Sequence, residues 1–268
     1  MTRSTMDPGN KRKIAGRRLP GPLVGLAAAV FWIAVWQVVS MAVAQELLVP
    51  SPLSVLRTLG ALAGTVGFWA ATARSLGRVV TGFAAAAVAG SVAAVLTVRF
   101  RAADALLSPL LRVIRATPVA SFIILALVWI RTDALPAFIA FLMVVPVVWG
   151  NVEKGIRRID PQLLEMARVY RFGAVKTLLR VRIPAVMPYF LAACTTGLGF
   201  AWKSSIAAEV ICRPLVSIGK NLQDAKLYLE TPEVFAWTIA VVALSLLLEK
   251  LLMQAARRFG RRWGAEDA

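Results

Sequence analysis

The sequence contains no histidine, only two cysteines, and far fewer acids than bases. Without histidine the chain cannot form imidazole metal sites, Ser-His or Cys-His nucleophile pairs, or histidine proton relays. Cys194 and Cys212 fall on one predicted helix, where 18 residues at ~1.5 Å each separate them by about 27 Å. That distance excludes a disulfide within the chain. We therefore expect no catalytic group, no metal site and no cofactor.

The shortage of acids leaves 31 Lys and Arg against 14 Asp and Glu, a net charge of +17. Such a surplus can indicate nucleic-acid binding, but here the bases lie between apolar segments and are rarely interleaved with aromatic residues. Hydrophobic residues make up 59% of the 268, against the ~45–50% of soluble domains. The composition predicts an all-α integral membrane protein in contact with lipids, with no nucleic-acid partner.

Six apolar segments are candidates for membrane helices: 23–44, 79–98, 116–130, 134–152, 185–211 and 234–252. The third is short for a core of ~30 Å that needs about 20 residues, so Arg115 and Arg131 are expected to snorkel at its ends. This division predicts a basic N-terminal tail at 1–22, a six-helix domain at 23–252 and a C-terminal tail at 253–268.

The second of these segments carries a small residue at every fourth position: Gly82, Ala86, Gly90 and Ala94. In lipid, stripes of small residues let helix backbones approach closely. We expect a close helix contact along this stripe.

The first apolar segment has two interpretations. The six bases before it and the sequence Ala42-Val43-Ala44 at its end are compatible with a cleaved signal peptide. Its 22 apolar residues exceed the usual core of ~7–15, and further spans follow, so we favour an uncleaved first membrane helix.

The distribution of Lys and Arg predicts the orientation of the spans. With the N-terminus inside, 23 of the 31 bases fall in inner segments. Both termini and the segment 153–184 are therefore predicted to face the cytoplasm.

The segment 153–184 is a charged interruption between apolar spans, with eight bases and three acids. Nothing so charged can lie in hydrocarbon. Asp160-Pro161 predicts the start of a helix, because Asp can cap free N–H groups and Pro at the first position lacks the N–H that would be unpaired.

A glycine separates this helix from a second one. Gly173 is expected to make the break, and a helix at 174–182 follows, which Ile183-Pro184 is expected to end. The product is a helix-turn-helix with an apolar underside and basic flanks.

This helix-turn-helix resembles the EAA loop of the permease subunits of bacterial ABC importers. Glu165-Met166-Ala167, followed at the right distance by Ile183-Pro184, carries the resemblance. The stretches RATPVASFIILALVWI at 115–130 and GFAWKSSIAAEVI at 199–211 look most like the nitrate, sulfonate and taurine group of that family. The family usually has Gly six residues after the Glu, where this chain has Arg171, and Gly173 offers a turn residue nearby.

The resemblance implies a six-helix permease in the bacterial cytoplasmic membrane, paired with a second permease subunit that we expect to be an identical copy. It implies that the EAA helix docks in a groove of a separate ATPase dimer and that an extracytoplasmic solute-binding protein delivers the solute. The residues expected to couple to the ATPase are Glu165, Met166, Ala167, Tyr170, Arg171, Gly173, Ile183 and Pro184. Specificity in this family lies mainly in the binding protein, so nitrate, taurine, alkanesulfonates and pyrimidine vitamin precursors all stay open.

The stretch GLGFAWKS at 197–204 is close to the nucleotide-binding pattern G-x-x-x-x-G-K-[ST]. Trp202 replaces the second glycine, and an indole there would block the backbone cradle that a phosphate needs. The stretch also lies within an apolar span. We expect no ATP binding by this chain.

The most suggestive polar residues of the fifth span are Lys203, Ser204, Ser205 and Glu209. A cation facing lipid at the membrane centre costs about 2.5–3.5 kcal/mol, so Lys203 is expected to face protein, a water-filled path or the outer interface. Six residues at 100° each place Lys203 and Glu209 on different helix faces. Two interpretations stay open: the four residues line or gate the solute path, or they anchor the outer end of the helix.

Two classes of function fit a multi-span protein of this kind. A self-contained secondary transporter usually shows intramembrane acids or histidines and internal repeats. The spans here contain almost no acids and no histidine. We predict a permease subunit without enzymatic activity, whose ATP hydrolysis is carried by a partner.

Overall fold

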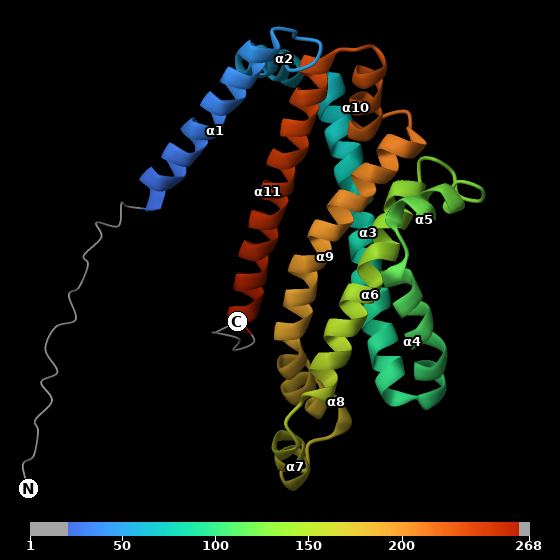
Figure 1. Ribbon diagram of the computed structural model, residues 1–268. Coiled ribbons are helices and arrows are strands. Elements are labelled where there is room, and N and C mark those ends of the chain that lie inside the picture. The colour runs from blue at the N-terminus through green and yellow to red at the C-terminus, as the bar shows by residue number, and fades with distance from the viewer. Residues whose placement is uncertain (1–20, 263–268) are drawn as a thin grey trace, which may run out of the picture.

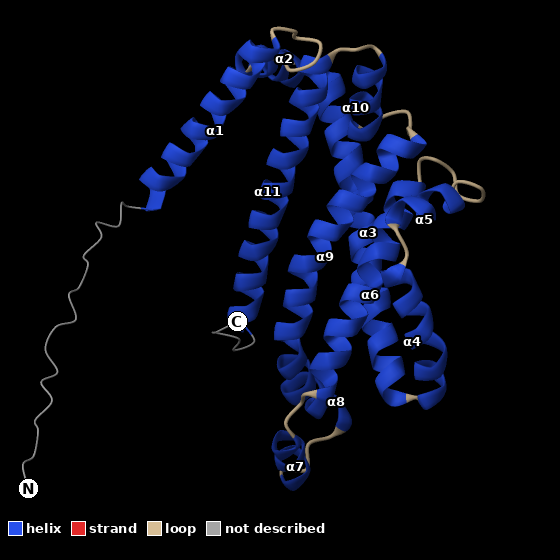
Figure 2. Ribbon diagram, in the orientation of Figure 1, coloured by secondary structure: helices blue, strands red, loops and turns tan. Residues whose placement is uncertain are grey.

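A computed structural model describes residues 21–262, and helices make up nearly all of this part, with no strand in it (Figure 2). The elements are α1 (Gly21–Val43), α2 (Pro52–Ala63), α3 (Val66–Arg99), α4 (Arg101–Ala116), α5 (Val119–Ala126), α6 (Leu135–Arg157), α7 (Pro161–Val169), α8 (Ala174–Thr177), the π-helix η1 (Leu178–Arg182), α9 (Ile183–Cys212), α10 (Ile218–Leu227) and α11 (Thr231–Arg262).

Five of the described helices are long and apolar enough to cross a membrane: α1, α3, α6, the continuous run Ala174–Cys212, and α11. A sixth crossing is obtained only if α4 and α5, which are bent by 105° at their junction, count as one span. The predicted all-α membrane fold is confirmed, and the described residues contain five to six spans where the sequence predicts six.

The prediction of a continuous third span at 116–130 is wrong. Thr117 is extended, with ψ 135°, because the ring of Pro118 disfavours helical backbone in the residue before it. The helix that follows, α5, has only 8 residues, or about 12 Å, and cannot cross the membrane alone.

The long helices run roughly side by side, with α6 packed along both α3 and α9 (Figure 1). At one end of the bundle lie α2 and α10, and at the other lie α7 and α8. The helix α1 leans away from the bundle and contacts α2, and its Trp36 ring stacks on Phe235 of α11. The start of α1 and the end of α11 both point toward the α7 end.

The predicted stripe of small residues on α3 is buried and packs against α6. A Cβ at Gly82 would lie 2.3 Å from the Ala137 carbonyl oxygen, and one at Gly90 would lie 2.8 Å from Val148 Cβ. These glycines let the two backbones approach within a distance that any larger residue would prevent.

The predicted limits of the terminal spans differ from the structure. The last helix, α11, continues to Arg262, so the start of the predicted tail 253–268 is helical. The predicted tail 1–22 lies outside the described residues except for its last two, which begin α1.

Both cysteines are buried on α9 and form no disulfide.

Candidate functional site

The first candidate site is the hairpin formed by α7, α8 and η1, which projects from one end of the bundle (Figure 1). The helix α7 starts where the sequence predicts. Asp160 caps it by accepting a 2.9 Å hydrogen bond from the Gln162 N–H, and Pro161 occupies the first turn. The cap leaves the start of α7 fixed at the exit of α6.

The turn after α7 is made by Arg171, so the prediction that Gly173 makes it is wrong. Arg171 has a left-handed φ of 51°, the Phe172 N–H donates to the Ala167 carbonyl at 2.8 Å, and the Arg171 N–H donates to the Arg168 carbonyl at 2.9 Å. This pair of bonds is the Schellman motif, whose left-handed position is usually glycine. Gly173 has φ −65° and precedes α8 in extended conformation.

The second arm of the hairpin does not end at Pro184, contrary to the prediction. In the π-helical turn η1, the Ile183 N–H bonds to the Leu178 carbonyl five residues earlier, and α9 follows without a break. The π turn changes the backbone hydrogen bonds from four to five residues apart just before Pro184. Pro184 then lies in the first turn of α9, where its missing N–H does not interrupt the helix. A single run of 39 residues, Ala174–Cys212, therefore joins the hairpin to the membrane.

The outer surface of the hairpin combines exposed apolar side chains with bases. Ala167 is 2% exposed and packs inward, whereas Met166 and Tyr170 point outward. The Glu165 carboxylate is exposed and has no ion-pair partner within residues 21–262. Lys176 lies over the Phe172 ring, 4.1 Å from its centroid. Exposed apolar side chains rimmed by polar ones are typical of a protein-binding surface.

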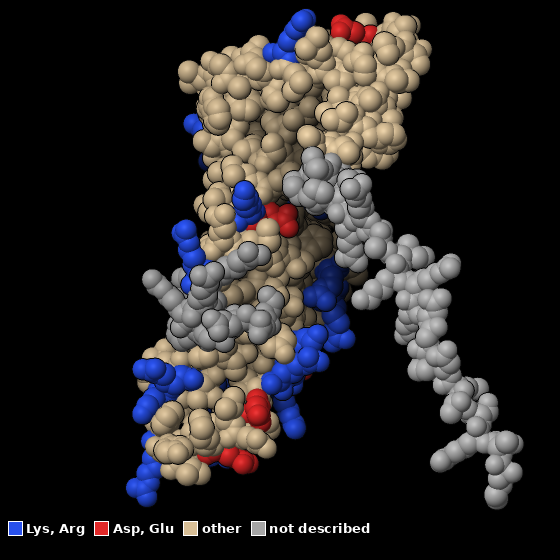
Figure 3. Space-filling model, turned by 90° about the vertical axis from the view of Figure 1, so that its left-hand side faces the viewer, with Lys and Arg blue, Asp and Glu red and all other residues tan. Residues whose placement is uncertain are grey.

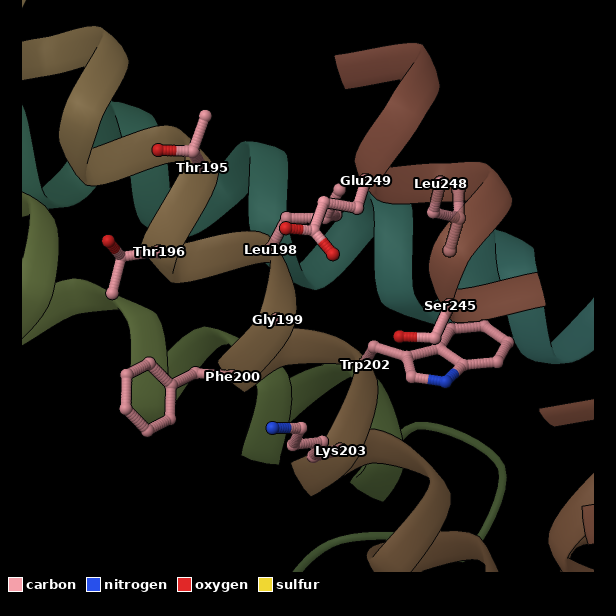
Figure 4. Close-up of a pocket in the computed structure, with 10 residues that line it drawn as sticks. All are labelled: Thr195, Thr196, Leu198, Gly199, Phe200, Trp202, Lys203, Ser245, Leu248 and Glu249. Atoms are coloured by element: carbon pink, nitrogen blue, oxygen red, sulfur yellow. The ribbon is translucent and has the colours of Figure 1, made fainter. Parts of the chain in front are cut away.

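The second candidate site is a hollow of about 350 Å³ between α9 and α11 (Figure 4). Its polar lining comprises Thr195, Thr196, Lys203, Ser245 and Glu249. Figure 4 shows the Glu249 carboxylate extending from α11 toward α9, and the Lys203 side chain on α9. The two charges form no ion pair with each other. Ionisable side chains within spans usually face a water-filled path or the bundle interior.

The structure separates the four residues of the fifth span that the sequence analysis singled out. Only Lys203 lines the hollow and is exposed. The Ser204 hydroxyl donates to the Ala201 carbonyl of its own helix, and the Ser205 hydroxyl is buried without a partner. Glu209 is 0% exposed and lies on another face of α9, as the 100° rotation per residue predicts.

Glu209 belongs to a buried polar cluster that sequence analysis missed. Its carboxylate accepts hydrogen bonds from Arg78 Nη1 at 3.0 Å, from the Ser75 hydroxyl at 2.7 Å and from the Gly219 N–H at 3.2 Å. Arg78 Nε also donates to the Asp133 carbonyl oxygen, in the connection between α5 and α6. The cluster ties α3, α9, α10 and this connection together near the α10 end.

One signal in the sequence could have indicated this pairing. An acid within an apolar span requires a base or several donors nearby, and Arg78 directly precedes the apolar run of α3. Gly219 is also needed for the contact, since a Cβ there would lie 2.4 Å from Glu209 Cβ.

Comparison with known proteins shows which family the chain belongs to. Residues 86–264 match the family model described as "Binding-protein-dependent transport system inner membrane component". The chain is 30% identical over 250 residues to the bicarbonate transport system permease protein CmpB of Synechococcus elongatus, covering 88% of each chain. It is 27% identical over 250 residues to SsuC of Bacillus subtilis, which is assigned to aliphatic sulfonate transport, covering 92% of this chain and 90% of that protein.

A solved structure shows the same fold. The crystal structure of an amino acid ABC transporter with histidines matches with a TM-score of 0.56 over 70% of this chain and 90% of that one. The sequence identity is 18%, so this likeness concerns the arrangement of helices alone.

Proposed function

Because this chain belongs to the family of binding-protein-dependent transport system inner membrane components, we propose that its hairpin docks the ATPase of an ABC importer and that the α9–α11 hollow forms part of the solute path. The chain is a permease, a multi-pass inner-membrane transport subunit without enzymatic activity, and its ATPase is a separate partner. The predicted family and function are thereby confirmed, and the alternative of a self-contained secondary transporter is excluded.

The observation that carries the coupling proposal is the unbroken helical run Ala174–Cys212. It begins in the hairpin and ends beside the Glu209 cluster, and Lys203 lies on it. A helix held in a partner's groove moves as a rigid body with that partner. A displacement of the hairpin by the ATPase would therefore reach the side chains of the hollow through one helix.

The charge distribution supports a cytoplasmic hairpin. Figure 3 shows one face of the molecule, on which Lys and Arg gather over the half that includes the hairpin end. The other half shows few Lys and Arg, mainly at its tip. Bases are enriched on the cytoplasmic side of membrane proteins. We propose that the hairpin and both chain ends lie in the cytoplasm and that the α2 and α10 end receives the binding protein.

We propose that two copies of this chain form the path and that the solute is a small anion. The relatives named above are assigned to bicarbonate and aliphatic sulfonates, both of them anions. Lys203 supplies a cation without a carboxylate partner in the described part of the chain, and the Thr196 and Ser245 hydroxyls supply donors, whereas the Thr195 hydroxyl already donates to the Ala192 carbonyl. A hollow of about 350 Å³ has the size of a small-molecule site, which typically measures ~300–1,000 Å³.

The proposal is tested with the permease, its ATPase and its binding protein reconstituted in vesicles. Glu165→Arg should leave assembly in the membrane intact but abolish the stimulation of ATP hydrolysis by loaded binding protein. Arg101→Glu, an exposed charge reversal on α4, is the matched control. Equal coupling in Glu165→Arg and wild type would overturn the docking assignment.

The solute path is tested in the same vesicles. Lys203→Gln should lower the rate of anion uptake while ATP hydrolysis remains responsive to loaded binding protein. Arg101→Gln, an exposed base on α4 outside the hollow, is the control. Unchanged uptake by Lys203→Gln would remove Lys203 from the path.

A further inference from the structure

A second hollow, of about 460 Å³, lies where the hairpin meets the bundle. It is bounded by the last turns of α3 and α6, by α7 and η1, and by the start of α9. We propose that this hollow binds an acyl chain of an anionic phospholipid from the leaflet on the hairpin side, with the phosphate held by Arg99 and Arg182.

The interior of the hollow is apolar. Nine of its twelve lining residues are Val, Ile or Leu, among them Val98, Ile156 and Ile183. The other three lining residues are Arg99, Arg182 and Ser91. The Ser91 hydroxyl already donates to the Ala87 carbonyl at 2.7 Å. The interior therefore offers no free hydrogen-bonding side chain to a polar solute, and it suits a hydrocarbon chain.

The two arginines supply the charge that selects an anionic headgroup. Arg99 is the last residue of α3 and Arg182 the last of η1, and both side chains are exposed. Neither forms an ion pair within residues 21–262. Guanidinium groups bind phosphate oxygens with two parallel hydrogen bonds, and basic pockets between membrane helices bind anionic headgroups.

The walls of the hollow continue onto the lipid-facing surface of the bundle. Val95 lines the hollow yet is 55% exposed, and Val92 and Val88, on the same apolar helix, are exposed as well. A lipid can thus enter sideways from the bilayer, whereas a water-soluble partner would first have to displace lipid from these valines. This continuity favours a lipid chain over a peptide.

A bound lipid would contact the hairpin and the bundle at once. Leu164 of α7 and Leu178 of η1 face the hollow from the hairpin side, and Val98 and Ile156 face it from α3 and α6. Occupancy would hold the hairpin at one angle to the bundle. The lipid composition of the membrane would thus influence how stiffly the hairpin is mounted.

The test uses the full-length chain in nanodiscs of phosphatidylcholine, alone or mixed with phosphatidylglycerol. Phosphatidylglycerol should raise the melting temperature of the wild type and should remain bound after transfer to detergent, as read by native mass spectrometry. In the double variant Arg99→Gln/Arg182→Gln, lipid affinity should fall roughly 30-fold, from the attraction of each base to anionic lipid. Arg101→Gln/Arg112→Gln, two bases of α4 outside the hollow, is the matched control.

A second variant tests the interior without touching charge. Val95→Trp, on the exposed wall of the hollow, should reduce lipid retention while leaving the melting temperature in pure phosphatidylcholine unchanged. Stabilisation by inorganic phosphate equal to that by phosphatidylglycerol would show a free-anion site instead of a lipid site. No dependence on phosphatidylglycerol, or equal losses in the two double variants, would overturn the proposal. None of these readouts involves transport, so the result is independent of the proposed function.

Discussion

Arg78 and Glu209 lie 131 residues apart in the sequence, yet Arg78 Nη1 is 3.0 Å from Glu209 Oε1. The carboxylate is fully buried, and the Arg78 side chain is 11% exposed. Within residues 21–262, the donors to this carboxylate come from α3 and the start of α10, so Glu209 fixes how these two helices meet α9. The carboxylate depends on Arg78 because it cannot be hydrated in place, whereas Arg78 is partly exposed and also pairs with the Asp133 carboxylate at 3.3 Å.

Removing one member of this pair should strongly destabilise the protein. We expect Arg78→Ala to cost about 3–5 kcal/mol, since it leaves a buried carboxylate without its base. The measurement is the thermal unfolding of purified protein in detergent. Arg74→Ala, an exposed arginine one turn earlier on α3, should change little. Equal melting temperatures for the two variants would contradict the prediction.

The two classes of glycine on α3 should respond in opposite directions to alanine. Gly82→Ala introduces a Cβ 2.3 Å from the Ala137 carbonyl oxygen and should destabilise by about 1–3 kcal/mol, the usual cost of overpacking. Gly77→Ala, on the same helix, meets nothing within 4 Å and should stabilise by roughly 0.5–1 kcal/mol through better helix propensity. The melting temperatures of both variants test this prediction. A lower melting temperature in Gly77→Ala than in wild type would argue against the described packing.

A pH dependence is expected from Asp224 on α10. The hydrogen bond from Lys220, and then that from Arg213, lowers the pKa of this carboxyl below its usual range. Its contribution to stability is therefore complete above the usual pKa of about 3.9 and is lost as the pH falls through the lowered value. The groups are partly exposed, so the effect should not exceed about 1 kcal/mol. Melting curves from neutral pH to about pH 3 should show a steeper loss for wild type than for Asp224→Asn.

The sequence allowed the long helices to be predicted because lipid requires apolar runs of about 20 residues with their backbone bonds satisfied internally. The same reasoning failed at Pro118, where 15 uncharged residues were counted as one span although the proline restricts Thr117. It failed at Pro184 in the opposite sense. There the local rule ends a helix, and a π turn instead carries it through.

The candidate sites were only partly predictable. Asp160-Pro161 and the EAA residues are local in sequence, so their place on the hairpin could be read directly. The hollow requires Lys203 and Glu249 to face it from two helices, and the buried cluster requires Arg78 to meet Glu209. Such contacts depend on how helices pack, which a single sequence does not specify.

In the hairpin turn, Arg171 has the role that the sequence predicts for Gly173. Arg171 adopts the left-handed conformation, which costs a residue with a Cβ roughly 1–2 kcal/mol relative to the right-handed region. Arg171→Gly removes that strain and should stabilise the hairpin, while Arg171→Val, whose branched Cβ tolerates the turn least, should loosen it. Gly173 needs no positive φ, and a Cβ there meets nothing within 4 Å.

Gly173→Ala should therefore leave the turn unchanged, and it serves as the matched control. Hydrogen exchange of the Phe172 and Arg171 amides reports the Schellman bonds directly, with slower exchange expected in Arg171→Gly and faster exchange in Arg171→Val. Because a stiffer hairpin transmits motion better, coupled ATP hydrolysis in the reconstituted importer should be faster in Arg171→Gly than in Arg171→Val. Faster exchange in Gly173→Ala than in Arg171→Val would show that the glycine makes the turn after all.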